Sequence, residues 1–304
     1  MTTNKQFDFR EIACPVCTAG DSQFVGWRGG EAHQSGAGVK TAIVRCKECS
    51  HQYPNPMPFP IAELHEIYVD VDEYFHGHVI ETKKENGLQL MGEFEQRLGR
   101  KGRFLDVGCG AGEALWAAKQ SGWDSTGIDP SKEFIEIGQK RLGVDGRVTT
   151  LENARFPDGH FDAILMGGII EHLYDPFETL SEVNRVLHPK GWLFFDAPNE
   201  DGLYMRLGNL YMRLRGKNCV VVMAPTFPPY HVQGFNPNSL RKLLNRAGFL
   251  VKSLEIAGDV CEPQGENSLR KKIEFAGAKL INRVGKSFNM GSYMSVWTQK
   301  GDVG

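Results

Sequence analysis

From residue 103 onward, short apolar runs alternate with longer segments in which apolar residues recur every three or four positions. Short runs of this kind are typical of buried strands, and the longer segments are typical of helices with one buried face. The alternation predicts a parallel sheet covered by helices on both faces. Strands are predicted at 103–107, 124–128, 146–150, 161–166, 191–196, 250–256 and 292–298. Helices are predicted near 112–121, 131–142 and 176–187.

The stretch before this alternating region has two different patterns. Residues 61–100 predict helices, because apolar positions share one face around Leu64 and Ile67 and another around Leu88, Met91 and Phe94. The first 55 residues are rich in glycine and poor in periodic apolar positions, too thin to build a core of their own. We therefore expect a small module over residues 1–56 and one large α/β domain over residues 57–304.

Four of the seven cysteines form two pairs with two residues between the members of each pair. Each pair can place two thiolates on one tight turn, and two such turns facing each other supply the four sulfur ligands that Zn²⁺ prefers. The pattern predicts a structural zinc ribbon, with a rubredoxin-like iron site or a redox pair as the alternatives. The predicted ligands are Cys14, Cys17, Cys46 and Cys49.

Two neighbours of the second cysteine pair bear on this module. His51 could replace one cysteine as a ligand, but we expect a surface histidine. Between Tyr53 and Pro60 there are four prolines, which predict a stiff, extended linker that holds the ribbon at a fixed distance and packs against nothing.

Glycines at 108, 110 and 112 follow the first predicted strand of the large domain, and Asp129 ends the second. Glycine allows sharp turns and close backbone approach to a ligand, and the following helix offers free N–H groups. An acidic side chain at Asp129 can accept hydrogen bonds from both ribose hydroxyls. A dinucleotide fingerprint needs a third glycine where Glu113 stands, so its spacing is excluded.

The run from Asp106 through these glycines resembles the first motif of class I S-adenosylmethionine (SAM)-dependent methyltransferases. Phe161-Asp162 and the later Glu171-His172-Leu173 are similar to the fourth strand of that family and its ending. The resemblance implies a Rossmann-like, doubly wound, seven-stranded and mostly parallel sheet whose last strand is antiparallel beside the fifth. It also implies SAM as cofactor, with these binding residues: Asp106, Gly108, Cys109, Gly110, Gly112, Asp129, Glu152 and Asn153.

The ribbon and the proline-rich segment together resemble the opening of bacterial methyltransferases of natural-product and cell-surface sugar pathways, joined here to a core like that of ubiquinone O-methyltransferases. In such enzymes a histidine can remove the proton of an acceptor hydroxyl. The resemblance points to His172, after the fourth strand, and to His231, in a phrase typical of the lid over the acceptor. A structural hydrogen bond that ties the loop to the helix is the alternative role for His172, and Glu171 is expected to be a hydrogen-bond partner.

Two insertions, at about 200–235 and 259–290, are expected to form the acceptor pocket or a homodimer contact, with simple packing on the sheet as the alternative. The net charge is −2, which argues against a surface that binds nucleic acid. Nothing approaches the roughly 18 continuous apolar residues of a membrane span, and the start of the chain has no signal-peptide core. We expect a cytoplasmic protein without membrane partners.

The leading hypothesis is methyl transfer from SAM to a hydroxyl of a small molecule such as a sugar, a sugar nucleotide or a natural-product intermediate. Carbon methylation of a keto-sugar is one alternative. A second is an RNA or protein methyltransferase whose ribbon reads the substrate, which predicts a basic stripe on the ribbon around Lys40, Arg45 and Lys47. A third is a noncatalytic SAM-binding protein, which the intact glycine loop disfavours. The sequence names neither the acceptor nor the methylated atom.

Overall fold

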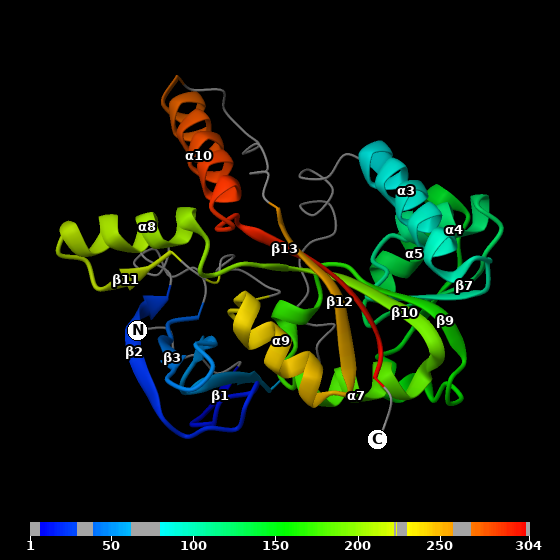
Figure 1. The fold of residues 1–304 in the computed structure, drawn as a ribbon, viewed down its shortest axis with the longest axis horizontal. Coiled ribbons are helices and arrows are strands. Elements are labelled where there is room, and N and C mark those ends of the chain that lie inside the picture. The colour runs from blue at the N-terminus through cyan, green and yellow to red at the C-terminus, as the bar shows by residue number, and fades with distance from the viewer. Residues whose placement is uncertain are drawn as a thin grey trace.

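The computed structural model describes residues 7–28, 39–61, 80–221, 223, 230–257 and 269–301. A seven-stranded sheet lies at its centre (Figure 1), with strand order β12-β13-β10-β9-β6-β7-β8. Strand β13 runs antiparallel to both of its neighbours, and the other neighbouring pairs are parallel. The strands are β6 (Arg103–Val107), β7 (Asp124–Asp129), β8 (Gly146–Val148), β9 (Phe161–Met166), β10 (Leu187–Pro198), β12 (Phe249–Ala257) and β13 (Tyr293–Lys300). The expected fold class is confirmed, with the antiparallel last strand beside the fifth.

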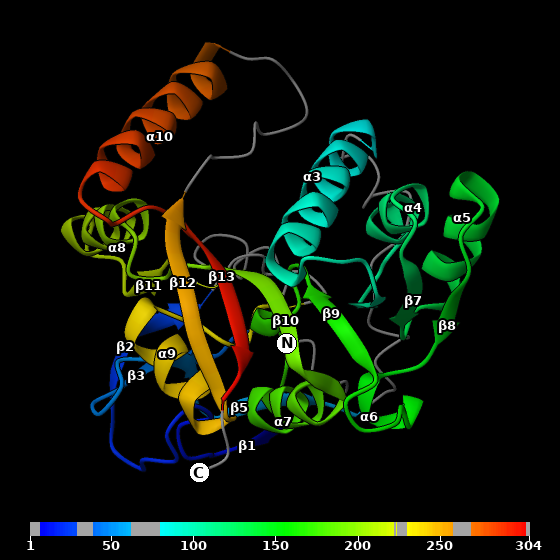
Figure 2. The same cartoon turned by 45° about the vertical axis from the view of Figure 1, so that its right-hand side comes forward.

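Helices cover both faces of this sheet, as Figure 2 shows. One face carries α3 (Ile80–Leu98), α4 (Glu113–Gln120) and α5 (Lys132–Leu142), and the other carries α6 (Leu151–Ala154), α7 (Pro176–Val186) and α9 (Pro237–Arg246). Buried Phe94 and Phe104 belong to the core under the first face, and Leu240 and Phe249 belong to the core under the second. The two cores account for the apolar stripe on each helix and the apolar runs in the strands.

Local sequence signals explain where two of these helices begin. Asp175 accepts a hydrogen bond from the backbone N–H of Glu178 and precedes a proline in the first turn of α7. Asn236 and Ser239 form a reciprocal capping box at the start of α9, which also has a proline in its first turn. Such caps satisfy backbone N–H groups that have no partner inside the helix.

The structure differs from the predicted elements in two places. Strand β10 begins at Leu187 and includes residues 189–191, whereas the fifth strand is predicted to begin at residue 191; its pairing with β9 is irregular there. Leu88, expected on the buried face of its helix, is 40% exposed. The helix predicted around Leu64 and Ile67 lies outside the described residues.

The cysteine-containing module is built from two small sheets. One is four-stranded in the order β11-β2-β3-β4, and the other pairs β1 with β5. Strand β11 comes from the large domain and pairs in parallel with β2, so the two parts of the chain share a sheet. The strands are β1 (Phe7–Arg10), β2 (Ser22–Arg28), β3 (Ala42–Cys46), β4 (Gln52–Pro54), β5 (Met57–Pro60) and β11 (Cys219–Val220).

The expectation of a stiff spacer at residues 53–60 is wrong. This segment forms β4 and β5, and Tyr53 and Met57 are both 0% exposed. Their side chains belong to the same core as Leu240 and Phe249 of the large domain. Proline is tolerated in edge strands such as these, because its missing N–H does not interrupt a ladder on both sides.

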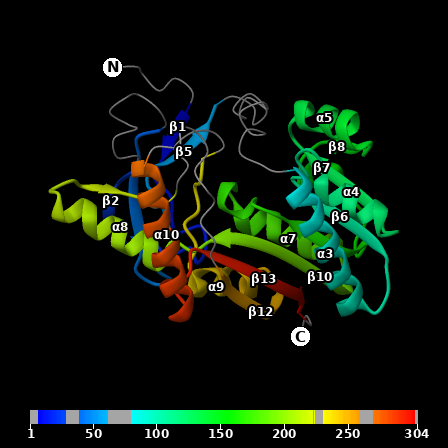
Figure 3. The same ribbon diagram turned by 90° about the horizontal axis from the view of Figure 1, so that it is seen from above.

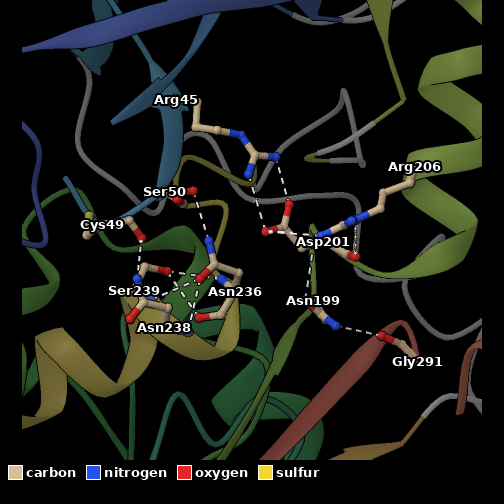
Figure 4. Close-up of polar contacts among 10 residues, drawn as sticks. All are labelled: Arg45, Cys49, Ser50, Asn199, Asp201, Arg206, Asn236, Asn238, Ser239 and Gly291. Atoms are coloured by element: carbon tan, nitrogen blue, oxygen red, sulfur yellow. Dashed lines mark hydrogen bonds and ion pairs between the residues drawn. The ribbon is translucent and has the colours of Figure 1, made fainter. Parts of the chain in front are cut away.

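Polar contacts fasten the module to α9 and to the end of β10 (Figure 4). Asn236 Nδ2 donates to the Ser50 carbonyl at 2.8 Å, and Asn238 Nδ2 donates to the Cys49 carbonyl at 3.3 Å. Arg45 forms an ion pair with Asp201, with 2.7 Å between Nη2 and Oδ1. The second cysteine turn is therefore bound directly to the helix that follows the His231 segment.

His51 is also part of this interface, so the expectation of a surface histidine is wrong. Its side chain is 0% exposed, and its Nε2 lies 2.8 Å from Oε1 of Gln233. Gln233 in turn donates to the Leu173 carbonyl at 2.7 Å. His51 therefore connects the module to the two segments that carry His172 and His231.

The two insertions contribute α8 (Leu203–Leu214) and α10 (Leu269–Ser287), which contact each other beyond the end of the sheet (Figure 3). No residue of α8 is buried. Its exposed apolar side chains include Leu207, Leu210 and Leu214. Among the described helices, none combines the length and the apolar character needed to cross a membrane.

Candidate active site and metal centre

The loop that leaves β6 is shaped by three glycines in the left-handed region, with φ of 69°, 52° and 83° at Gly108, Gly110 and Gly112. A Cβ on Gly108 would lie 2.2 Å from Cδ1 of Ile169, and one on Gly112 would lie 2.5 Å from Cγ2 of Val144. The loop therefore requires glycine at both positions for its backbone shape and for its own packing.

Asp129 fixes this loop from the end of β7. One carboxylate oxygen accepts the Gly110 N–H at 2.9 Å, and the other accepts the Ser131 N–H at 2.8 Å. Burial raises the pKa of Asp129, and these two N–H groups oppose the rise. Each oxygen of an ionised carboxylate can accept two hydrogen bonds, so the side chain keeps acceptor capacity for a ligand hydroxyl.

Two cavities meet at the glycine loop, sharing Gly108, Gly110 and Gly167. The first has a volume of about 450 Å³ and contains Asp129, Glu152, His172 and Tyr174 in its wall. The second has a volume of about 480 Å³ and contains Lys83, Asp106, Cys109, Glu113 and Asp196. Both lie at the carboxyl ends of the parallel strands, where open α/β sheets bind their ligands.

The predicted binding residues are distributed unevenly between these cavities. Asp106 and Cys109 line the second cavity, and Glu152 lines the first. Glu152 also accepts a hydrogen bond from the Thr179 hydroxyl at 2.8 Å, which holds its carboxylate at the cavity wall. Gly112 and Asn153 line neither cavity.

The two predicted histidines lie together, with 4.8 Å between their ring centroids. His172 lines the first cavity, and His231 stands edge-on behind it. His172 Nδ1 lies 3.1 Å from the Tyr230 carbonyl oxygen. A carbonyl oxygen can only accept, so Nδ1 carries the proton and the neutral ring keeps an unprotonated Nε2.

Glu171 joins the segment that carries His172 to the segment that carries His231. Its backbone carbonyl accepts the N–H groups of Val232 and Gln233 at 2.8 and 3.0 Å. Its carboxyl is buried, and its Oε2 has no hydrogen-bond partner. Glu171 therefore aligns the two histidine segments through its backbone, which is consistent with the expected role as a hydrogen-bond partner.

Burial changes the ionisation of all three groups. It lowers the pKa of His172 to about 4 and raises the pKa of Glu171 to about 8. Burial also lowers the pKa of His231, and the neighbouring His172 adds to that effect. At neutral pH both histidines are therefore neutral, and the Glu171 carboxyl is mostly protonated.

Sequence reasoning missed two residues of the cavity walls. Tyr174 lies two positions after His172 and lines the first cavity. Asp196, near the end of β10, accepts the Gly168 N–H at 2.8 Å and so holds the loop after β9. The position of Asp196 late in a buried strand was the available signal, because such strand ends meet at the same edge of the sheet.

The four cysteines of the two pairs come together as the spacing predicts, with their Sγ atoms all within 4.8 Å of one another. Cys14 and Cys49 are 3.6 Å apart at sulfur, and Cys17 and Cys46 are 3.5 Å apart. Tetrahedral Zn²⁺ with Zn–S bonds of about 2.3 Å places its sulfurs about 3.8 Å apart. The donor set and its spacing fit a closed, structural zinc site.

Comparison with known proteins identifies the large domain. The family described as "Methyltransferase domain" matches residues 78–254, more than half of the chain. Ubiquinone biosynthesis O-methyltransferase of Chromobacterium violaceum is 27% identical over 163 residues, covering 51% of this chain and 68% of that protein. A putative methyltransferase of Bacillus subtilis is 34% identical over 111 residues, covering 34% of this chain and 45% of that protein.

Among solved structures, a SAM-dependent methyltransferase from Archaeoglobus fulgidus superimposes with a TM-score of 0.52 at 21% identity. The match covers 76% of this chain and 98% of that chain. It shows the same fold. The chain therefore belongs to the methyltransferase domain family.

Proposed function

We propose that the protein transfers the methyl group of SAM to a hydroxyl group of a small molecule. One observation carries this proposal: a single cavity is lined both by the glycine loop with Asp129 and by His172. The methyl group of SAM and the proton-accepting ring of His172 would then lie in the same cavity. Such a site can hold the reacting atoms together and exclude water.

The residues present fit SAM. We expect the fixed carboxylate of Asp129 to accept hydrogen bonds from the ribose hydroxyls and Glu152 to lie beside the adenine. Asp106 and Cys109 line the second cavity, where we expect the methionine part of the cofactor. Bound SAM supplies an electrophilic methyl group with its own leaving group, so the protein needs to contribute mainly orientation.

His172 is the residue that we propose as the base. Its Nδ1–H is committed to the Tyr230 carbonyl, which leaves Nε2 to accept the proton of an acceptor hydroxyl. Burial keeps the ring neutral near pH 7, which is the form that accepts a proton. His231 contacts the His172 ring edge-on and does not line the cavity, so we assign it to positioning.

A small-molecule acceptor is supported by the charges of the module surface. A ribbon that reads RNA would present free cations, whereas Arg45 is paired with Asp201 and Lys47 with Asp21. The ubiquinone biosynthesis O-methyltransferases to which the chain is similar carry an O-methylation activity in their name, which also favours a hydroxyl acceptor.

The proposal is tested by incubating the zinc-loaded protein with methyl-labelled SAM and fractionated metabolite extracts, then identifying the labelled product by mass spectrometry and NMR. A label on a small-molecule oxygen is the expected result. A label found on carbon, or only on RNA or protein, would overturn the proposed acceptor class.

A further inference from the structure

A buried arginine of the cysteine-containing module contacts the segment that carries His231. Arg28 is the last residue of β2, and its side chain is 0% exposed. Its Nη2 donates to the backbone carbonyl of His231, while Nε and Nη1 are buried without a hydrogen-bond partner among the described residues. Buried guanidinium groups are normally fully hydrogen-bonded, so the two unused nitrogens need an explanation.

The surroundings of Arg28 do not neutralise it. No carboxylate among the described residues lies within 4.0 Å of its guanidinium. Glu200 is the acidic group that influences it, but burial raises the pKa of Glu200 to about 7, so that carboxyl is only partly charged at neutral pH. Glu200 also directs one oxygen to the Met223 N–H, at 3.0 Å. Glu200 therefore offsets the charge of Arg28 only in part, and Glu200 Oε2 is also buried without a hydrogen-bond partner among the described residues.

Two phenol groups lie near the same guanidinium. Tyr174 and Tyr230 both interact electrostatically with Arg28, and burial raises the pKa of Tyr174 to about 12, so its hydroxyl is protonated. Tyr174 also lines the cavity that contains Asp129 and His172. The guanidinium has two unused N–H-bearing nitrogens, and the protonated phenols add hydroxyl groups that can donate to a ligand as well as accept from Arg28. An oxyanion is the ligand that such a set of donors recognises.

We propose that Arg28 binds an anionic group, a carboxylate or a phosphate, on the methyl acceptor. This inference rests on the proposed function and names the class of acceptor: a hydroxylated small molecule that carries an oxyanion. Arg28 holds the His231 carbonyl, and the His231 ring contacts His172, so the anion site and the base are joined through one residue. An anion bound at Arg28 would hold the same molecule next to His172 Nε2.

The carboxylate of the cofactor itself is a competing occupant. The second cavity, where we expect the methionine part of SAM, has its own cation in Lys83 and lies on the Asp106 side of the glycine loop. Arg28 instead interacts electrostatically with Tyr174, which lines the first cavity, and donates to the His231 carbonyl. The placement therefore favours the acceptor over the cofactor as the source of the anion.

The test compares the wild type with Arg28→Gln and Arg28→Met. Gln is neutral and can still donate to the His231 carbonyl, so it separates charge from packing. Arg45→Met is the matched control, because it removes another arginine of the same module, one that pairs with Asp201. Thermal unfolding is recorded with sodium phosphate and with sodium chloride at equal ionic strength. Labelled methyl transfer is measured to dihydroxybenzoate, to its uncharged amide and to a hydroxylated phenyl phosphate.

Phosphate is expected to raise the melting temperature of the wild type and of Arg45→Met, and to leave both Arg28 variants unchanged. The wild type should prefer one of the anionic acceptors over the amide by roughly 10- to 100-fold, as charge-assisted hydrogen bonds imply. That preference should fall below about threefold in Arg28→Gln. Comparison of dihydroxybenzoate with the hydroxylated phenyl phosphate shows whether the anionic group is a carboxylate or a phosphate.

Three results would overturn the assignment. The first is a phosphate response and an acid preference that survive in both Arg28 variants, which would make Arg28 structural. The second is an absent response and preference in the wild type. The third is loss of SAM binding by calorimetry in Arg28→Gln, which would place the cofactor carboxylate there. If the wild type fails to bind SAM but still responds to phosphate through Arg28, the proposed function fails and anion binding stands.

Discussion

His172 Nδ1 donates to the backbone carbonyl of Tyr230 across 3.1 Å, joining the end of β9 to the segment that precedes α9. This single bond selects the tautomer of the ring and orients Nε2 away from the backbone. His172 also lines the cavity that Asp129 lines. The bond therefore leaves His172 with an unprotonated Nε2 that can accept a proton at this cavity.

Replacing His172 by Ala should lower kcat by about 10²- to 10⁴-fold, the usual contribution of a general base. SAM affinity should stay unchanged, because the hydrogen bonds that hold Asp129 against the glycine loop do not involve His172. His188→Ala is the matched control, since His188 lies at the start of β10, at the opposite end of the sheet. Full turnover of His172→Ala would refute the assignment.

Replacing Glu171 by Gln should change how stability depends on pH. Burial raises the pKa of Glu171 to about 8 in the folded protein, against 4.5 normally. Because the Glu171 carboxyl holds its proton more tightly in the folded protein, it contributes stability that is fully present below pH 4.5 and is lost as the pH rises through 8. At pH 9 this contribution is lost in the wild type, so Glu171→Gln should be more stable than the wild type by on the order of 5 kcal/mol.

Melting temperatures of the two proteins at pH 5.5, 7 and 9 provide the measurement. Glu200, with a pKa raised to about 7, gives the wild type a slope of the same sign, so the variant should flatten the pH dependence only in part. A difference between the two proteins that does not grow with pH would show that Glu171 is charged in the folded state.

Gly108→Ala should destabilise the protein for two separable reasons. Its φ of 69° costs an L-residue roughly 1–2 kcal/mol, and the new Cβ would meet Cδ1 of Ile169. Adding Ile169→Ala removes the clash but not the backbone cost, so the double variant should recover part of the loss. Denaturant unfolding of the wild type, the two single variants and the double variant measures the backbone cost and the cost of the clash. If the effects of the two substitutions are purely additive, the contact between the new Cβ and Ile169 is contradicted.

Metal removal tests the cysteine cluster. The wild type should carry one zinc per chain by elemental analysis, and Cys46→Ser should carry little. Because Val16, Tyr53 and Met57 share a core with the large domain, loss of the metal should lower the melting temperature of the whole chain in one transition. Iron in the purified protein, or an unchanged melting temperature without metal, would contradict a structural zinc site.

The sequence was sufficient for the parts of the fold that repeat a regular pattern. Strands β6 and β9 are mainly apolar runs because both of their faces are buried, and the glycines at 108, 110 and 112 mark a loop with a fixed backbone shape. Cys14 and Cys49 could be assigned to one cluster because metal ligation leaves a fixed spacing on each turn.

The wrong predictions concern residues whose environment is set by contacts with parts of the chain that are remote in the sequence. Pro54 and Pro58 indicated a spacer, but alternate residues such as Tyr53 and Met57 meet the core of the large domain. The environment of His51 depends on Gln233, which is remote in the sequence. Arg28 carries no local signal, because its role follows from where β2 ends relative to His231.

Calorimetric titration of SAM into the wild type, Asp129→Ala and Asp124→Ala tests the central claim most directly. Asp129 holds Gly110 and Ser131, whereas Asp124 is an exposed residue at the other end of the same strand. The wild type and Asp124→Ala should bind SAM with equal affinity, and Asp129→Ala should bind it about 10- to 100-fold more weakly. No binding by the folded wild type, or equal affinity in Asp129→Ala, would contradict the account.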